Sequence, residues 1–465
     1  MSKALSEPLL ARDDGRGTPS SSTLSSAIVL AKVIVGTGLF ALPPAIRAAG
    51  WLLSSVMVVL LALVTTYTMV IIIRSIRVLR SRFPDALDGR IEFQEMTAAA
   101  FPGALMNGVI IFICVLGQLG SIMASWAFAA SNIMSLSPYI QRWQVILACA
   151  GFLAPLSLLR TTSHPAFQAA MGFGNIAVGL AVATVLYGGF AQGGLHPLEK
   201  RIDVSGVGVA FGVTVFMLTG YMEVVSIEQD MRSRPAFERM LASTFVAVTA
   251  LYLAFGIAVY SFFGEATGRV WQQGHWAAAT IMENLQSGWV TNAVKVTFSV
   301  NLLLMSPIVL LPASKAIEDA LALTAKRPLL QRAARLGLVA AMGGASLMPA
   351  GFEVITAVVG CLTGITAFSI PALCYLRLAE PLPCAHRAWL YLVVAIGICG
   401  TTYAMAQLVS SESATPIYQG GNASTPPLSP AEGVGTTRPP PHAGALPAHP
   451  DHPETHPAHP ADHRG

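Results

Sequence analysis

The sequence predicts an all-α membrane protein, and three observations carry that prediction. The 465 residues are 54% hydrophobic and only 11% charged, whereas about 25% of the residues of a soluble globular protein are charged. Apolar runs long enough to cross a bilayer recur along most of the chain. Two of these runs are interrupted by glycine near their middle, where a spanning helix normally keeps its backbone hydrogen-bonded.

About eleven of these runs are expected to form spanning helices. Their approximate bounds are 25–45, 52–73, 104–134, 143–159, 166–190, 204–227, 241–263, 290–313, 336–348, 353–376 and 389–409. The ends of the chain are polar and low in complexity, with serines near the start and Pro, Ala, Gly and His near the end. We therefore predict a transmembrane domain over 25–409 between two disordered ends, 1–24 and 410–465.

The basic residues predict the orientation of these spans. The loops after the even-numbered spans are rich in Arg and Lys, whereas the opposite loops hold only Arg47, Arg142, Lys200, Arg201 and Arg269. Because cytosolic loops carry the excess of Arg and Lys, the N-terminus is predicted to be cytosolic. An odd number of spans then makes the C-terminal end non-cytosolic, where Asn422 in the sequon Asn422-Ala423-Ser424 would be open to glycosylation.

The polar ends and the charge balance indicate no further partner. His-Pro pairs recur from His449 to Pro460, and clustered imidazoles are able to bind zinc or copper. The composition is more typical of a solvated tail, so we predict no metal site and no cofactor. The net charge of +4 follows from the orientation signal and indicates no nucleic-acid partner.

The first span is broken in its middle by Gly36, Thr37 and Gly38, with Pro43 and Pro44 shortly afterwards. This pattern favours local unwinding, which a membrane tolerates only where the backbone lies beside protein or water. Half-helix ends at that depth present amide donors on one side and carbonyl acceptors on the other. Such ends suit the carboxylate and the ammonium group of an amino acid, which predicts a transporter.

A second break is expected in the sixth span, at Leu218-Thr219-Gly220-Tyr221-Met222. Paired breaks in corresponding positions of two halves mark the binding site of many transporters. The alternative is that these glycines only allow close helix packing. The pairing of the two breaks favours the binding site.

Several separated stretches resemble the amino acid/auxin permease family, and most of all its proton-coupled and vacuolar branches. The first span carries Lys32, Gly36-Thr37-Gly38-Leu39 and Leu42-Pro43, similar to the family's lysine, GTG and LP pattern. The third span carries Gln118, Gly120, Phe128, Ala130, Asn132 and Ile133, and the sixth continues as Val224-Val225-Ser226-Ile227-Glu228-Gln229-Asp230-Met231-Arg232. The resemblance covers the whole membrane domain.

This resemblance implies a LeuT-type fold, in which two inverted repeats of five helices precede an eleventh helix and helices 1 and 6 are broken. It also implies a secondary active amino acid transporter rather than an enzyme. The spans themselves carry no HExxH pair, nucleophile elbow or cluster of carboxylates and histidines, which agrees with a non-enzymatic function.

The breaks then predict the substrate-binding residues. Amides from Thr37 to Phe40, including those of Gly38 and Leu39, are expected to hold the substrate carboxylate. Carbonyls from Val33 to Gly36, with those near Thr219 and Gly220, are expected to hold its ammonium group. Phe40 and Tyr221 are candidate pocket walls, and Gln118 is expected to face the bundle interior because a polar side chain is costly in lipid.

Lys32 and Glu223 are the charges nearest to the breaks, and both lie on the cytosolic side. We predict that they pair across spans 1 and 6 as part of an inner gate, with Glu223 able to take up a proton. In the alternative, Lys32 reaches the cytosolic surface and Glu223 faces water as a fixed charge.

The coupling ion is less well defined by the sequence. Val29 stands where several proton-coupled members of the family have histidine, and Met305, a poor ligand for a hard cation, stands where sodium-coupled relatives have threonine before Ser306. The titratable Glu223 favours proton coupling. A sodium-coupled or uncoupled carrier and a transporter-like amino acid sensor remain alternatives, and so do a vacuolar or lysosomal membrane and the plasma membrane.

Overall fold

The computed structural model describes residues 21–82, 91–158, 165–272, 275–320, 328–348 and 351–414. The predictions for Asn422 and for the His-Pro pairs lie outside the described residues, as does most of both predicted disordered ends. Within the described part, α2 begins at Thr23 and α16 ends at Ala414. The helical domain therefore extends slightly beyond 25–409 at both ends.

Helices occupy every one of the predicted runs in the described part of the chain. They are α2 (Thr23–Ile34), α3 (Gly38–Ala49), α4 (Trp51–Arg82), α6 (Ala104–Met134), α7 (Arg142–Ser157), α8 (Pro165–Gly193), α9 (Val207–Leu218), α10 (Glu223–Asp230), α11 (Phe237–Phe263), α12 (Trp289–Ala320), α13 (Pro328–Ser346), α14 (Phe352–Gly364), α15 (Ile370–Leu378) and α16 (Cys384–Ala414). The all-α membrane fold is confirmed.

The number of spans is less sharply defined than the fold. By length and hydropathy, eight helices in the described residues are able to cross a membrane, and the bent pair of α2 and α3 makes nine. The two predicted runs that remain are α7, which has 16 residues, and α13, which carries Arg332 and Arg335. Counting these two gives the eleven predicted spans.

Both predicted breaks are present. Helix α2 ends at Ile34 and α3 begins at Gly38, and the two helix axes are bent by 53°. Helix α9 ends at Leu218 and α10 begins at Glu223. The breaks touch each other, because a Cβ atom added at Gly38 would lie 2.5 Å from the Cβ of Met217.

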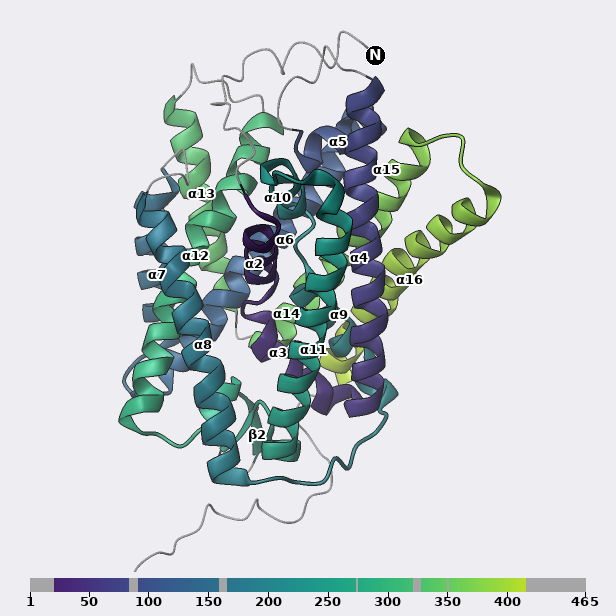
Figure 1. The fold of residues 1–465 in the computed structure, drawn as a ribbon. Coiled ribbons are helices and arrows are strands. Elements are labelled where there is room, and N and C mark those ends of the chain that lie inside the picture. The colour runs from purple at the N-terminus through teal and green to yellow at the C-terminus, as the bar shows by residue number, and fades with distance from the viewer. Residues whose placement is uncertain are drawn as a thin grey trace, which may run out of the picture. The chain divides into compact units, whose positions relative to one another are not determined.

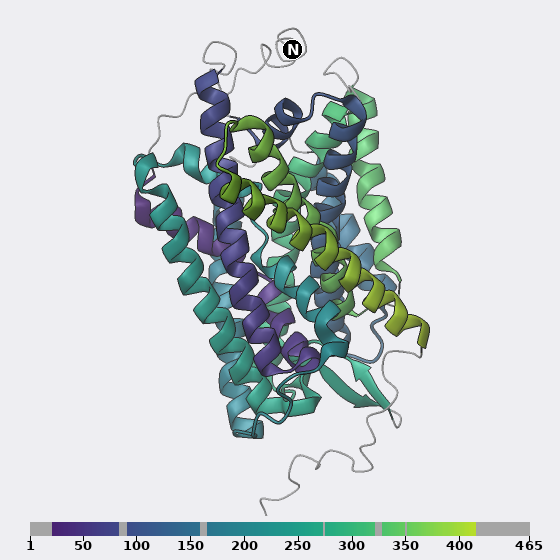
Figure 2. The same ribbon diagram turned by 90° about the vertical axis from the view of Figure 1, so that its right-hand side faces the viewer.

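The two halves of the first span lie very differently in the bundle. Helix α2 is seen almost end-on in Figure 1, and in Figure 2 it lies across the bundle and projects from it. Helix α3 instead packs against α9 and α11 inside the bundle. A further close crossing joins α9 to α14, since a Cβ at Gly212 would lie 2.1 Å from the carbonyl oxygen of Ala357.

Several elements were not predicted. A short helix α5 (Phe93–Ala100) precedes α6, and a π-helix η5 (Ile365–Ser369) interrupts the tenth span between α14 and α15. The loop between α11 and α12 contains an antiparallel hairpin of β1 (Arg269–Gln272) and β2 (His275–Ala278), with Arg269 opposite Ala278. Short 3-10 helices are η1 (Val204–Gly206), η2 (Arg234–Ala236), η3 (Gly264–Ala266) and η4 (Ile281–Asn284).

The hairpin defines one end of the bundle, which we call the outer end. The opposite end, where α4 finishes at Arg82 and α11 begins at Phe237, is called the inner end and is the end predicted to be cytosolic. Figure 1 shows the inner end at the top and the hairpin at the bottom.

Candidate functional site

A cavity of about 480 Å³ lies where the two breaks meet α6, α8 and α12. Its wall is formed by Ile28, Ala31, Lys32, Val33, Ile34, Val35, Gly36, Thr37, Gly38, Gln118, Ser121, Ile122, Ser125, Gly174, Asn175, Val178, Phe216, Met217, Thr219, Tyr221, Met222, Glu223, Phe298, Asn301, Leu302, Met305, Ser306, Ile308 and Val309. The volume lies within the usual range for small-molecule sites, about 300–1,000 Å³.

Most of the predicted site residues line this cavity. They are Gly36, Thr37, Gly38, Gln118, Thr219 and Tyr221, together with the two charged residues Lys32 and Glu223. Leu39, Phe40 and Gly220 are not part of the wall in the described structure. Leu39 and Phe40 are buried behind it, and Gly220 faces α2, where an added Cβ would lie 3.5 Å from Cγ1 of Val33.

The first break gives the cavity one positive edge. Helix α3 starts after Thr37, whose side chain makes no capping hydrogen bond. The first bonds after the break run from the amide of Leu39 to the carbonyl of Gly36 (3.2 Å) and from the amide of Phe40 to the carbonyl of Thr37 (3.1 Å). Free amides at a helix N-terminus form a ready site for an anion such as a carboxylate.

Lys32 and Glu223 lie at helix ends that suit their charges. Lys32 is in the last turn of α2 and Glu223 is the first residue of α10, so each charge faces the helix-dipole end of opposite sign. The pairing of Lys32 with Glu223 stays a prediction.

The second break is held in place by neighbouring spans. The hydroxyl of Tyr221 donates to Oγ1 of Thr366 in the π-helix η5 (2.9 Å), and its ring contacts Phe93 of α5 at a centroid distance of 5.0 Å. Gln118 of α6 donates from Nε2 to Sδ of Met222 (3.2 Å). Gln118 thus faces the bundle interior, as predicted.

Apart from Gln118, the sequence reasoning did not place the wall formed by α6, α8 and α12 in the substrate site. Its polar members are Ser121, Ser125, Asn175, Asn301 and Ser306. A signal was present in α6, because Gln118, Ser121 and Ser125 follow helical spacing and share one face of an otherwise apolar helix.

Aromatic rings close the cavity toward the outer end. Phe298 belongs to the cavity wall and its ring lies 4.9 Å from that of Phe40 and 5.4 Å from that of Phe128, between ring centroids. Phe128 also contacts Phe352 (4.8 Å), and Phe40 contacts Phe255 (5.6 Å). We call these five residues the aromatic plug. Phe40, predicted as a pocket wall, lies one layer behind Phe298.

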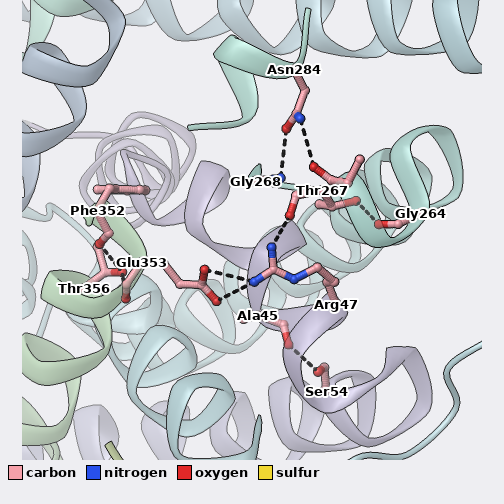
Figure 3. A network of polar contacts seen from close by, with 11 residues as sticks. Ala45, Arg47, Ser54, Gly264, Thr267, Gly268, Asn284, Phe352, Glu353 and Thr356 are labelled. Atoms are coloured by element: carbon pink, nitrogen blue, oxygen red, sulfur yellow. Dashed lines mark hydrogen bonds and ion pairs between the residues drawn. The ribbon is translucent and has the colours of Figure 1, made fainter. Parts of the chain in front are cut away.

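A buried ion pair lies beyond the aromatic plug at the outer end (Figure 3). Arg47, expected in a loop, instead lies in α3 with 3% of its surface exposed. Its Nη2 lies 3.2 Å from Oε2 of Glu353 in α14, and its Nη1 donates to the carbonyl of Thr267 (2.5 Å). Arg47 thereby joins the first span, the tenth span and the loop that carries the hairpin.

Asn284 supports this loop from within. Its Oδ1 accepts from the amide of Gly268 (2.8 Å), and its Nδ2 donates to the carbonyls of Ala266 (2.9 Å) and Arg269 (2.8 Å). Gly268 has φ +69°, a conformation that favours glycine. The turn that presents the Thr267 carbonyl to Arg47 is therefore fixed by hydrogen bonds on both sides.

Solved structures with this fold include a membrane transporter. A crystal structure of the manganese transporter of Eremococcus coleocola superposes with a TM-score of 0.50, and the match covers 84% of this chain and 87% of that chain at 11% sequence identity. At this identity the likeness shows the fold and nothing about the substrate.

Sequence comparison identifies the family. Amino acid transporter ANT1 of Arabidopsis thaliana is 28% identical over 84% of this chain and 91% of its own length, and amino acid transporter AVT3C of the same plant is 25% identical over 88% and 97%. Vacuolar amino acid transporter 3 of Saccharomyces cerevisiae is 24% identical over 68% and 44%. The model of the family described as transmembrane amino acid transporter protein matches residues 19–410. The chain belongs to this family of amino acid transporters.

Proposed function

We propose that this protein is a secondary active amino acid transporter that works by alternating access, with the cavity at the two breaks as its substrate site. The observation that carries this proposal is the meeting of both breaks at one cavity, which places free amides and carbonyls around the same space. Unwound backbone at this depth is typical of transporter substrate sites.

The two ends of an amino acid would be bound by different parts of the cavity. The amides of Thr37 and Gly38 at the start of α3 suit the carboxylate. Carbonyls at the end of α2 and around Thr219 suit the ammonium group, because carbonyl oxygens and the negative ends of helices favour cations. The side chain would then point toward the wall formed by α6, α8 and α12.

The structure has the features of a state that is closed at the outer end. The aromatic plug and the pair of Arg47 and Glu353 lie between the cavity and that end, whereas the wall continues along α2 as far as Ile28. Backbone bonds tie the segment just before α2 to the end of α10, from the amide of Ser21 to the carbonyl of Asp230 (3.1 Å) and from the amide of Arg232 to the carbonyl of Ser21 (3.0 Å). We propose that the inner halves of spans 1 and 6 move together during transport.

We propose proton coupling through Glu223, which lines the cavity and is titratable. The sodium alternative would use Ser306, but that hydroxyl already donates to the carbonyl of Leu302 (2.9 Å) and accepts from Nε1 of Trp126 (3.2 Å). The neighbouring Met305 offers only a thioether, a soft ligand that suits sodium poorly.

The membrane and the orientation are proposals as well. Relatives named vacuolar amino acid transporters favour the vacuolar membrane. The Arg and Lys distribution favours a cytosolic inner end with the C-terminus on the other side.

Uptake into proteoliposomes tests this function directly. Purified protein is reconstituted and offered a panel of labelled amino acids with an imposed pH gradient, an imposed sodium gradient or none. Accumulation above equilibrium driven by the pH gradient alone supports the proposal. Accumulation driven by sodium alone would move the coupling to the sodium alternative, and saturable binding without uptake would identify a sensor.

A further inference from the structure

Each helix break leaves several backbone carbonyls without their helical partners, and one such carbonyl at each break is followed here. In unbroken helices the carbonyl of Ile34 would accept from the amide of Gly38, and the carbonyl of Met217 would accept from the amide of Tyr221. Both helices end at these points, α2 at Ile34 and α9 at Leu218. A buried carbonyl without a donor is costly, so each needs another partner.

One side chain meets both carbonyls. The hydroxyl of Tyr252 in α11 lies 2.9 Å from the carbonyl oxygen of Ile34 and 3.1 Å from that of Met217. Tyr252 has 0% of its surface exposed and is absent from the cavity wall among the described residues. It therefore reaches the breaks from the α11 side, while the cavity lies on the other side.

The bridge depends on the close contact between the two breaks. A Cβ at Gly38 would lie 2.5 Å from the Cβ and 2.7 Å from the Cα of Met217, so only glycine lets the backbones approach this closely. The ends of α2 and α9 then converge, and both carry negative dipole ends that favour a hydrogen-bond donor between them. A single phenol hydrogen, shared between two carbonyls, is suited to this position.

We infer that Tyr252 is a positioning residue for substrate binding, which fixes the broken ends of spans 1 and 6 relative to each other from behind the cavity. Its hydroxyl occupies the carbonyls of Ile34 and Met217 and leaves the neighbouring carbonyls and amides directed at the substrate. This inference rests on the proposed function, because it assumes that the cavity binds the transported amino acid.

Tyr252→Phe tests the inference, because it keeps the ring and removes only the hydroxyl. Tyr260→Phe is the matched control, since Tyr260 lies on the same helix and donates to Oε1 of Glu265 (3.2 Å), away from the breaks. Uptake kinetics in proteoliposomes and thermal melting of the purified protein are measured for the wild type and both variants.

We expect Tyr252→Phe to raise the KM for the transported amino acid about tenfold or more, because a misplaced donor and acceptor set weakens binding. The maximal rate per folded molecule should change much less, and Tyr260→Phe should keep the wild-type KM. An unchanged KM in a folded Tyr252→Phe protein overturns the inference. A wild-type protein that neither binds nor transports amino acids would instead overturn the proposed function.

If Tyr252→Phe does not fold, Tyr252→Lys decides the matter. The lysine ammonium extends about as far as the phenol oxygen and donates up to three hydrogen bonds. Folding and transport by Tyr252→Lys, where Tyr252→Phe is lost, would show that the donor is needed at the breaks. Loss of both variants would mean that the hydroxyl is needed for folding itself, and would overturn a role confined to positioning the breaks for the substrate.

Discussion

Removing the carboxylate of Glu353 should open the outer end of the transporter. Arg47 and Glu353 pair with only 4% and 11% of their side chains exposed. If the outer end opens during transport, α3 and α14 separate and both charges become solvated. The pair therefore stabilises the outer-closed state alone, and Glu353→Gln should shift the equilibrium toward the outer-open state.

The size of the shift follows from the contacts of Arg47. Glutamine keeps the size of the side chain and one hydrogen-bond acceptor, and the bond from Arg47 to the Thr267 carbonyl remains. The lost term is the charge-assisted bond to Glu353, and such bonds contribute about 1.5–3 kcal/mol. A shift of about 2 kcal/mol changes the ratio of the two states about thirtyfold.

Alkylation of a cysteine in the cavity measures this ratio. Ser125→Cys places a thiol on the cavity wall next to the aromatic plug, after the exposed Cys384 and Cys399 have been replaced by serine. A membrane-impermeant maleimide is added from either side of oriented proteoliposomes. Glu353→Gln should raise the rate from the outer side by roughly thirtyfold and lower the rate from the inner side.

Glu199→Gln is the matched control, because Glu199 is an exposed carboxylate at the same end of the bundle. It should leave both alkylation rates unchanged. Equal rates in Glu353→Gln and the wild type, from both sides, would show that the ion pair does not hold the outer end closed.

Three further predictions follow from the same structure. Glu223→Gln should abolish accumulation driven by a pH gradient while leaving exchange of substrate intact. The control is Glu380→Gln, which changes an exposed carboxylate and should behave as wild type. Accumulation with normal pH dependence in Glu223→Gln would rule out Glu223 as the coupling group. Gly212→Leu should prevent folding, because its side chain would meet the backbone of α14, whereas Gly179→Leu, with open space around it, should melt within a few degrees of the wild type. A protease-accessible tag at the C-terminus should be cleaved only from the non-cytosolic side, and a tag at the N-terminus only from the cytosol. Cleavage of both tags from the same side would show that a span has been miscounted.

The helices and breaks were predictable because their causes are local. Apolar runs of spanning length specify helices wherever the solvent is lipid, since the backbone must bond to itself. The break at Gly36, Thr37 and Gly38 is encoded by the glycines themselves. The structure confirms the break, because α2 ends at Ile34, just before this stretch, and α3 begins at Gly38.

The parts that were missed depend on contacts between distant segments. The burial of Arg47 requires Glu353 and the carbonyl of Thr267, which lie far apart in the sequence. The π-helix η5 carries no glycine or proline within Ile365–Ser369 that would signal it, and its Thr366 is bonded to Tyr221 of another span. Local sequence patterns do not indicate which distant residues will become such partners.

Phe40 illustrates the limit for the binding site. Its place directly after the first break predicted a pocket wall, and it is the third residue of α3, yet its ring belongs to the aromatic plug. The orientation of a side chain depends on which neighbouring helices offer it space. The sequence therefore predicted that the two breaks border the cavity, but not which side chains of the neighbouring helices face it.

Binding of a labelled amino acid to the purified Gly36→Val protein tests the central claim most directly. A Cβ at Gly36 meets nothing within 4 Å and the residue lines the cavity, so valine fills the proposed site without a clash. Gly179→Val, which also enters open space, is the control. We predict saturable binding of the amino acid to the wild type and to the control, and no measurable binding to folded Gly36→Val. Binding to Gly36→Val with wild-type affinity would contradict a substrate site at the helix breaks.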